Sequence, residues 1–201
     1  LSRMKATQIA RIVILTLAVA SASCGSTVRQ GTGTSFLIVN ELEFARGNEP
    51  ETFSANLLSD VITVVDDVPT FFNDLGRVTF SLGLKDPGPA GSPTQPTQNQ
   101  FITVDRYHVR FFRADGRNTQ GVDVPYEFDG AFTVTVGSSQ AEAGFTIVRN
   151  IAKREAPLQA LRTNGLILST IAEITFYGRD QTGHEVVATA RTSVDFANFG
   201  D

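Results

Sequence analysis

Apolar and polar residues alternate along several short stretches of this 201-residue chain, and that spacing restricts what it can fold into. The clearest example is residues 101–136. In its first arm, one face of an extended chain would carry Phe101, Tyr107, Val109 and Phe111. A two-residue period is typical of a strand with one buried face. The stretch predicts two strands joined by a polar loop.

Similar stretches occur before and after this hairpin. Further strands are predicted over residues 36–44, 61–65, 76–85, 144–151, 166–177 and 186–196. A short helix is predicted over residues 153–162, ended by Asn164 and Gly165. Residues 86–100 hold four of the eight prolines and predict a long, mobile surface loop. About eight strands with regularly spaced turns predict an all-β fold, an antiparallel β-sandwich forming one domain over residues 36–201.

The first 23 residues differ from the rest. Lys5 and Arg11 flank a basic region, and an apolar run over residues 12–20 follows. That run is shorter than the roughly 20 apolar residues a spanning helix needs. A basic region, an apolar region and small residues together indicate an export signal, which would form an N-terminal signal helix. Residues 24–35 are small and polar and predict a flexible tether.

The small residues Ser21, Ala22 and Ser23 lead into Cys24, the only cysteine of the chain. This stretch resembles the lipobox of bacterial lipoproteins, in which cleavage occurs before a cysteine that carries a diacylglyceryl group. The resemblance implies a lipid on Cys24 and a membrane anchor in the periplasm or at the cell surface. The family usually has leucine where Ser21 stands, and cleavage by ordinary signal peptidase, which would release a soluble protein, is the alternative.

The end of the chain carries a second resemblance. Residues 176–184 and the alternating strand after them resemble the closing hairpin of immunoglobulin-like and fibronectin-like modules of bacterial surface proteins. Together with residues 113–130, this hairpin also resembles a family of uncharacterised bacterial envelope proteins. The resemblance implies an immunoglobulin-like sandwich in an envelope protein.

Charge limits the partners. Removing residues 1–23 takes away three basic residues and no acidic one, which moves the net charge from −4 to −7. An acidic protein is a poor nucleic-acid binder, so nucleic acid is not predicted as a partner. Attachment to a membrane would have to come from the lipid on Cys24.

No catalytic or metal-binding pattern is found. The two histidines, His108 and His184, lie in no zinc-ligand spacing. Residues 137–141 have a glycine and two serines after a strand, but no helix follows to make a nucleophile elbow. Asp115 and Asp123 share a polar loop whose spacing is not that of an EF-hand. We therefore predict no enzyme activity, no metal and no cofactor.

One polar stripe is a candidate contact site. Arg106, His108 and Arg110 share a strand face and could contact an anionic sugar or a carboxylate on a partner. In the alternative interpretation, the stripe pairs with Glu127 and Asp129 on the neighbouring strand.

These observations predict a non-enzymatic, lipid-anchored protein of the cell envelope that acts as a structural or protein-interaction module. Its partners would be the membrane, through Cys24, and envelope proteins or glycans. The alternative is an extracytoplasmic lipoprotein that binds a small ligand or glycan. Such a protein should show a concave site lined by aromatics, with Tyr107, Tyr126 and Tyr177 as candidates.

Overall fold

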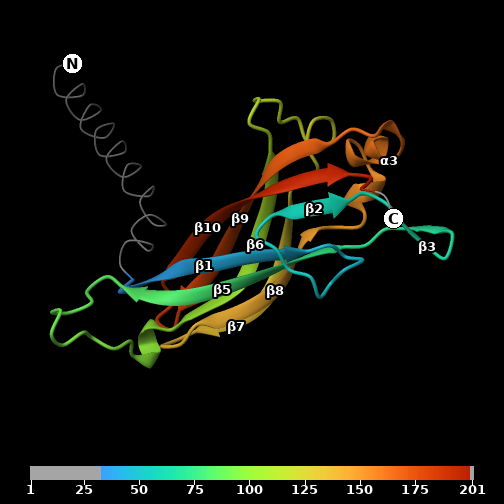
Figure 1. The fold of residues 1–201 in the computed structure, drawn as a ribbon. Coiled ribbons are helices and arrows are strands. Elements are labelled where there is room, and N and C mark those ends of the chain that lie inside the picture. The colour runs from blue at the N-terminus through green and yellow to red at the C-terminus, as the bar shows by residue number, and fades with distance from the viewer. Residues whose placement is uncertain (1–32, 200–201) are drawn as a thin grey trace, which may run out of the picture.

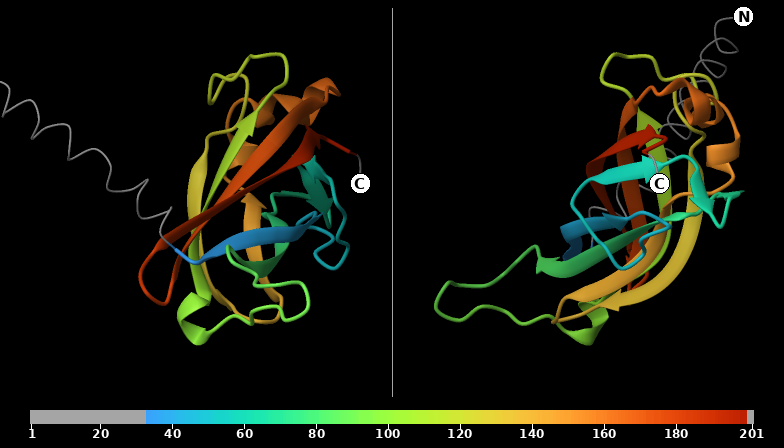
Figure 2. Two further views of the ribbon diagram at one scale, coloured as in Figure 1. Left: turned by 90° about the vertical axis from the view of Figure 1, so that its left-hand side faces the viewer. Right: turned by 45° about the vertical axis from the view of Figure 1, so that its right-hand side comes forward.

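The computed structural model describes residues 33–199, which form two facing β-sheets (Figure 1). Sheet A has the order β1 (Ser35–Ala45), β5 (Asp74–Leu84), β8 (Ala141–Val148). Sheet B has the order β2 (Leu57–Asp60), β10 (Glu185–Ala197), β9 (Leu168–Asp180), β6 (Ile102–Phe112), β7 (Phe128–Val136). The turned views of Figure 2 show the two layers, with the 86–100 loop extending beyond them. The predicted all-β sandwich is confirmed.

One strand pair departs from the antiparallel prediction. β2 runs parallel to β10, from Val194 opposite Leu57 to Ala197 opposite Asp60. Parallel neighbours need a long connection between them, and here nearly the whole domain lies between the two strands. No strand was predicted at β2, because four residues are too few to display an alternation.

A small ribbon lies outside both sheets. β3 (Thr63–Val65) pairs with β4 (Val68–Thr70), and Asp66 and Asp67 between them both have positive φ angles, 49° and 63°. Two such residues form the tight turn whose twist suits a two-residue hairpin. The predicted strand over residues 61–65 therefore starts too early, and Pro69 lies in β4.

The predicted helix over residues 153–162 is not continuous. The chain makes three separate short turns: η2 (Ala152–Arg154), η3 (Leu158–Ala160) and α3 (Leu161–Asn164). Pro157 lies between the first two and has no N–H to donate to a helical hydrogen bond. The predicted end is confirmed, because Gly165 takes a left-handed conformation with a φ of 62° just after α3.

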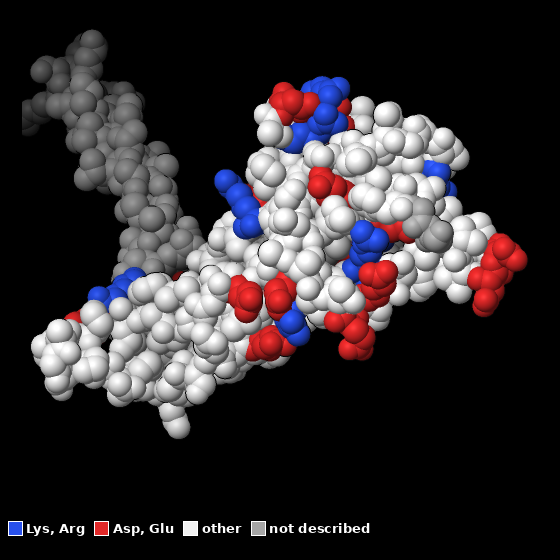
Figure 3. All heavy atoms as spheres, viewed as in Figure 1, with Lys and Arg blue, Asp and Glu red and all other residues white. Residues whose placement is uncertain are grey.

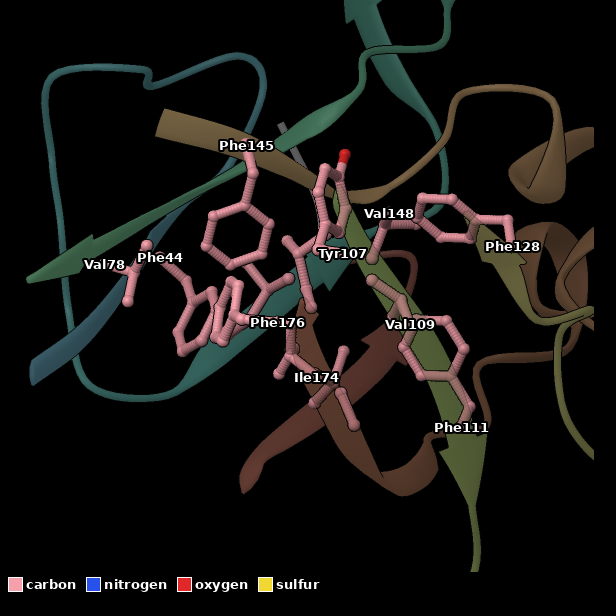
Figure 4. Packing of buried hydrophobic residues seen from close by; sticks show 14 of the residues in the cluster. Phe44, Val78, Tyr107, Val109, Phe111, Phe128, Phe145, Val148, Ile174 and Phe176 are labelled. Carbon is pink, nitrogen blue, oxygen red and sulfur yellow. The ribbon is translucent and has the colours of Figure 1, made fainter. Parts of the chain in front are cut away.

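Aromatic side chains fill the space between the sheets, as Figure 4 shows. The Phe176 ring of β9 meets Phe80 and Phe145 of sheet A edge to face, at centroid distances of 5.0 and 5.7 Å. Tyr107 of β6 meets Phe145 in the same manner at 5.2 Å. Edge-to-face contacts of this kind add to the stabilisation that burial gives. The phenylalanines thus join the two layers.

The two ends of the sandwich differ. Residue 33 enters at the end where β1 begins, and β10 finishes toward the other end, near α3 (Figure 1). The 86–100 loop lies at the first end and finishes in a short turn, η1 (Gln98–Gln100). Gln100 donates a side-chain hydrogen bond to Thr34 there. Within residues 33–199, no helix is both long and apolar enough to cross a bilayer.

Candidate functional site

A groove of about 800 Å³ lies along sheet B. Its lining comes from β6, β7, β9 and β10, the four long neighbouring strands of that sheet. Pockets that hold small molecules commonly measure about 300–1,000 Å³. The groove is therefore large enough for a small ligand.

A β-bulge in β6 positions the groove. The register of β6 against β9 shifts between Val104 and Arg106, so Asp105 is the extra residue in that pairing, whereas in the pairing with β7 the extra residue lies on β7. Bulges bend a strand and redirect its side chains, and they are common beside binding sites. Here both Asp105 and Arg106 line the groove.

The bulge also corrects the predicted alternation of this strand. Phe101 precedes β6 and does not share the face of Tyr107 within the strand. Because Asp105 is extra, the inward residues before it are Ile102 and Val104, and both are fully buried. A pattern with period two cannot reveal such an insertion.

A glycine on β9 allows the close approach of strands at the bulge. A Cβ at Gly178 would lie 2.5 Å from the backbone oxygen of Thr103 and 3.0 Å from Cα of Val104. No larger residue fits without a shift of the backbone. Gly178 is thus part of the groove floor and a condition for its shape.

An arginine and a tyrosine meet inside the groove. The guanidinium carbon of Arg106 lies 4.2 Å from the ring centroid of Tyr177. This cation–π contact holds the arginine side chain in place and leaves its N–H groups able to bind an acceptor. Of the three tyrosines proposed for a concave site, Tyr177 is the one that lines this groove.

Charges of both signs surround this pair. Asp105, Asp129 and Glu185 supply carboxylates, and Arg179 lies with its Nη2 3.6 Å from a carboxylate oxygen of Glu185. Together with Arg106, the groove holds three acids and two arginines. On the face displayed in Figure 3, charged side chains likewise form small mixed groups. The groove therefore suits a ligand with both hydroxyl or amine donors and carboxylate acceptors.

The structure separates the three residues of the predicted polar stripe. Arg106 lies in the groove, whereas His108 lies between two acids: its Nδ1 is 3.2 Å from Asp129 and its Nε2 is 3.7 Å from Glu127. The predicted pairing with Glu127 and Asp129 is confirmed for His108. The three side chains of the stripe therefore have different surroundings.

Arg110 is placed opposite Glu173 of β9. The Glu173 carboxylate, however, accepts two hydrogen bonds from Arg191, at 2.8 and 2.6 Å. Among residues 33–199, Arg110 forms no ion pair within 4.0 Å. Arg110 therefore remains a candidate contact on the open face of sheet B.

The other two tyrosines have structural positions. Tyr107 is buried, and its hydroxyl oxygen accepts a hydrogen bond from the backbone N–H of Thr146 at 3.2 Å. The exposed Tyr126 covers Gly121, where a Cβ would lie 2.3 Å from the tyrosine hydroxyl.

Asp180 organises the turn between β9 and β10. Its side chain accepts hydrogen bonds from the backbone N–H groups of Thr182 and His184, both at 2.9 Å, and from the Thr182 hydroxyl at 2.7 Å. Its second oxygen lies 2.9 Å from Nδ1 of His184. Burial alone would raise the pKa of Asp180, but these hydrogen bonds outweigh it and lower the pKa. His184 thus serves the turn in which it was predicted.

The polar loop before β7 is closed by its own arginines. Asp115 accepts hydrogen bonds from Arg113 at 2.6 Å and from Arg117 at 2.9 Å. The bonds from Arg113, then those from Arg117, lower the pKa of Asp115. Asp123 accepts a hydrogen bond from the backbone N–H of Thr119. No group of three or more metal-ligating side chains is placed to hold an ion anywhere in residues 33–199.

Sequence reasoning missed most of the groove. Asp105, Arg179 and Glu185 were not proposed, because only the register of four strands brings them together. One signal was available, since Gly178 interrupts an otherwise regular strand pattern. Cys24, the predicted signal peptide and most of the predicted tether lie outside the described residues.

Comparison with protein-family models, with curated proteins and with solved structures gives no match to this chain.

Proposed function

We propose that this protein is a non-enzymatic module of the bacterial cell envelope, exported and anchored by a lipid on Cys24. The observation that carries the proposal is the order of basic, apolar and small residues that ends in a lone cysteine. A single cysteine cannot form an internal disulfide, which favours another use for it in an exported protein. The sandwich that follows would be the structural or interacting part.

The way the chain enters the sandwich supports a short anchor. Gly33 is buried, and a Cβ there would lie 3.4 Å from Cβ of His184 in the β9–β10 turn. Nine residue steps separate Cys24 from Gly33. The tether predicted from the sequence would span about 16 Å on average over that length. This end of the domain would then lie close to the membrane, and the end with α3 and the β3–β4 ribbon would face away.

Mass spectrometry of the mature amino terminus from native envelope fractions tests the anchor. We expect a diacylated Cys24 and retention in the membrane fraction. A Cys24→Ser variant should appear in the soluble fraction with the sandwich intact. A free amino terminus upstream of an unmodified Cys24 would refute the lipid anchor and make the protein a diffusible one.

A second function, binding of a small ligand or glycan, is favoured by one observation. This is the groove with Arg106 held over Tyr177. Aromatic rings give sugars an apolar platform, while arginine binds carboxylate oxygens in a two-pronged manner. A short uronic-acid oligosaccharide is therefore the appropriate first probe.

The groove is tested by titrating the mature protein with that oligosaccharide. We expect Tyr177→Ala to weaken binding by at least about tenfold, because it removes both the ring and the support of Arg106. Tyr126→Ala is the matched control, since Tyr126 is exposed and outside the groove. Equal affinity in both variants would rule out the groove as the binding site.

A further inference from the structure

Two arginines share one phenylalanine ring at the end of the sandwich that carries α3. The guanidinium carbon of Arg154 lies 4.7 Å from the ring centroid of Phe71, and that of Arg162 lies 4.5 Å from it. The three residues come from η2, from α3 and from the connection between β4 and β5. We call them the arginine clamp. Two turns that lie close in the sequence thus bring two cations to one distant aromatic ring.

Among the described residues, no acid balances the two charges of the clamp. No carboxylate of residues 33–199 lies within ion-pair distance of Arg154 or Arg162. Arg162 donates one hydrogen bond, from Nη2 to the backbone oxygen of Lys153 at 2.7 Å, while its Nε is buried without a partner. Burial, and then the nearby charge of Arg154, lower the pKa of Arg162. The clamp is therefore a fixed pair of like charges in which some guanidinium N–H groups have no hydrogen-bond acceptor.

The surrounding fold holds the clamp in position. Lys153 precedes Arg154, and its Nζ is buried 2.8 Å from Oδ1 of Asp74. This ion pair neutralises Lys153 and fixes the turn that carries Arg154. Because Asp74 is already occupied, it does not compensate the arginines. The positions of both guanidinium groups are thus set before any ligand arrives, which reduces the entropy that binding must overcome.

We infer that the arginine clamp is a binding site for an oxyanion, a phosphate or carboxylate group with at least two oxygen atoms to accept hydrogen bonds. Such a group would balance the two like charges and accept hydrogen bonds from guanidinium N–H groups that have no partner within the protein. Planar guanidinium groups bind these anions with paired, charge-assisted hydrogen bonds. The site lies in the sandwich, so the inference does not depend on the lipid anchor or on the groove.

Calorimetric titration of the mature protein with inorganic phosphate tests the clamp, at constant ionic strength set with chloride. We expect saturable binding at one site. Arg154→Gln should weaken binding by about tenfold or more, because it removes one charge-assisted contact. Arg191→Gln is the matched control: it removes a cation that is already paired with Glu173, and it should leave the affinity within about twofold.

Two further measurements make the result decisive. Citrate in place of phosphate distinguishes a general oxyanion site, which binds both, from a phosphate-specific one. Arg162→Gln also loses the hydrogen bond to the Lys153 backbone oxygen, so its melting temperature is measured first to detect a loss of stability. The conclusion rests on the Arg154 variant, because Arg154 is exposed. Phosphate binding that is unchanged in Arg154→Gln, or absent from the wild-type protein, would overturn the inference.

Discussion

The buried ion pair between Asp74 and Lys153 allows the most direct test of what holds this fold together. Both side chains are almost entirely buried, at 0% and 2% exposure. The Lys153 ammonium lies 2.8 Å from Oδ1 of Asp74, which also accepts the Gly47 N–H at 3.0 Å. The Ser59 hydroxyl donates to Oδ2 at 2.6 Å. The pair therefore joins β5, β2, η2 and the loop after β1.

Lys153→Met removes the ammonium but keeps an unbranched apolar side chain of similar reach. Removing one partner of a buried pair costs about 3–5 kcal/mol, because the other charge is left with neither water nor a counter-ion. Domains have a total free energy of unfolding of about 5–15 kcal/mol, so this is a large part of it. Adding Asp74→Asn removes the stranded charge, and its amide oxygen still accepts a hydrogen bond. We expect the double variant to lose no more than about 2 kcal/mol.

The loss should also depend on pH. Burial, the largest influence, raises the pKa of Asp74 above its ordinary value of 3.8, although Lys153 acts to lower it. A carboxyl group with a raised pKa contributes stability that is fully present below 3.8 and is lost as pH rises through the folded-state pKa. Without Lys153 that pKa rises further. The cost of Lys153→Met should therefore be small near pH 4 and largest at neutral pH.

Urea unfolding followed by far-ultraviolet circular dichroism measures these differences at both pH values. Arg191→Met is the control, since it removes a cation from the exposed pair with Glu173 and should cost no more than about 1 kcal/mol. If Lys153→Met costs as little as the control at pH 7, or costs the same at both pH values, the reasoning about the buried pair is wrong.

Three further predictions concern turns and close contacts. Asp180→Asn should lower the free energy of unfolding by about 1–3 kcal/mol at neutral pH, measured by urea unfolding, because the charged acceptor of the turn is lost. Since the pKa of Asp180 is lowered, its contribution to stability is present above pH 3.8 and disappears as pH falls through the folded-state pKa. Gly178→Ala should lower the melting temperature, because its Cβ would meet the β6 backbone. Gly144→Ala is the control and should not, because the space around a Cβ there is open. Equal effects would contradict the close approach of β6 and β9 at Gly178. Gly165→Ala should lower the free energy of unfolding by about 1 kcal/mol, because a residue with a Cβ is strained at the left-handed φ of 62°. An unchanged melting temperature would show that α3 ends in a different conformation.

Alternation along the chain was sufficient to predict most strands of the two sheets, because the burial of one face is a local property. It failed where structure depends on distant partners. β2 is a strand only because β10 offers it an edge, and the bulge at Asp105 is defined by the pairing of β6 with β9. The predicted pairing of His108 with acids succeeded for the opposite reason, since β6 and β7 are consecutive strands whose register follows from one loop.

Both candidate binding sites lie where the regular sandwich is interrupted. In an uninterrupted strand pair an outward side chain has a cross-strand neighbour that can pair with it, as Asp129 does with His108. The extra residue in β6 and the broken helix around Pro157 remove that constraint, so Arg106 and Arg162 turn to aromatic rings instead of to acids. Stacking on a ring fixes a guanidinium without consuming its charge. Such arginines remain able to bind an anion, and this makes them better indicators of function in this fold than the charged residues of its regular strands.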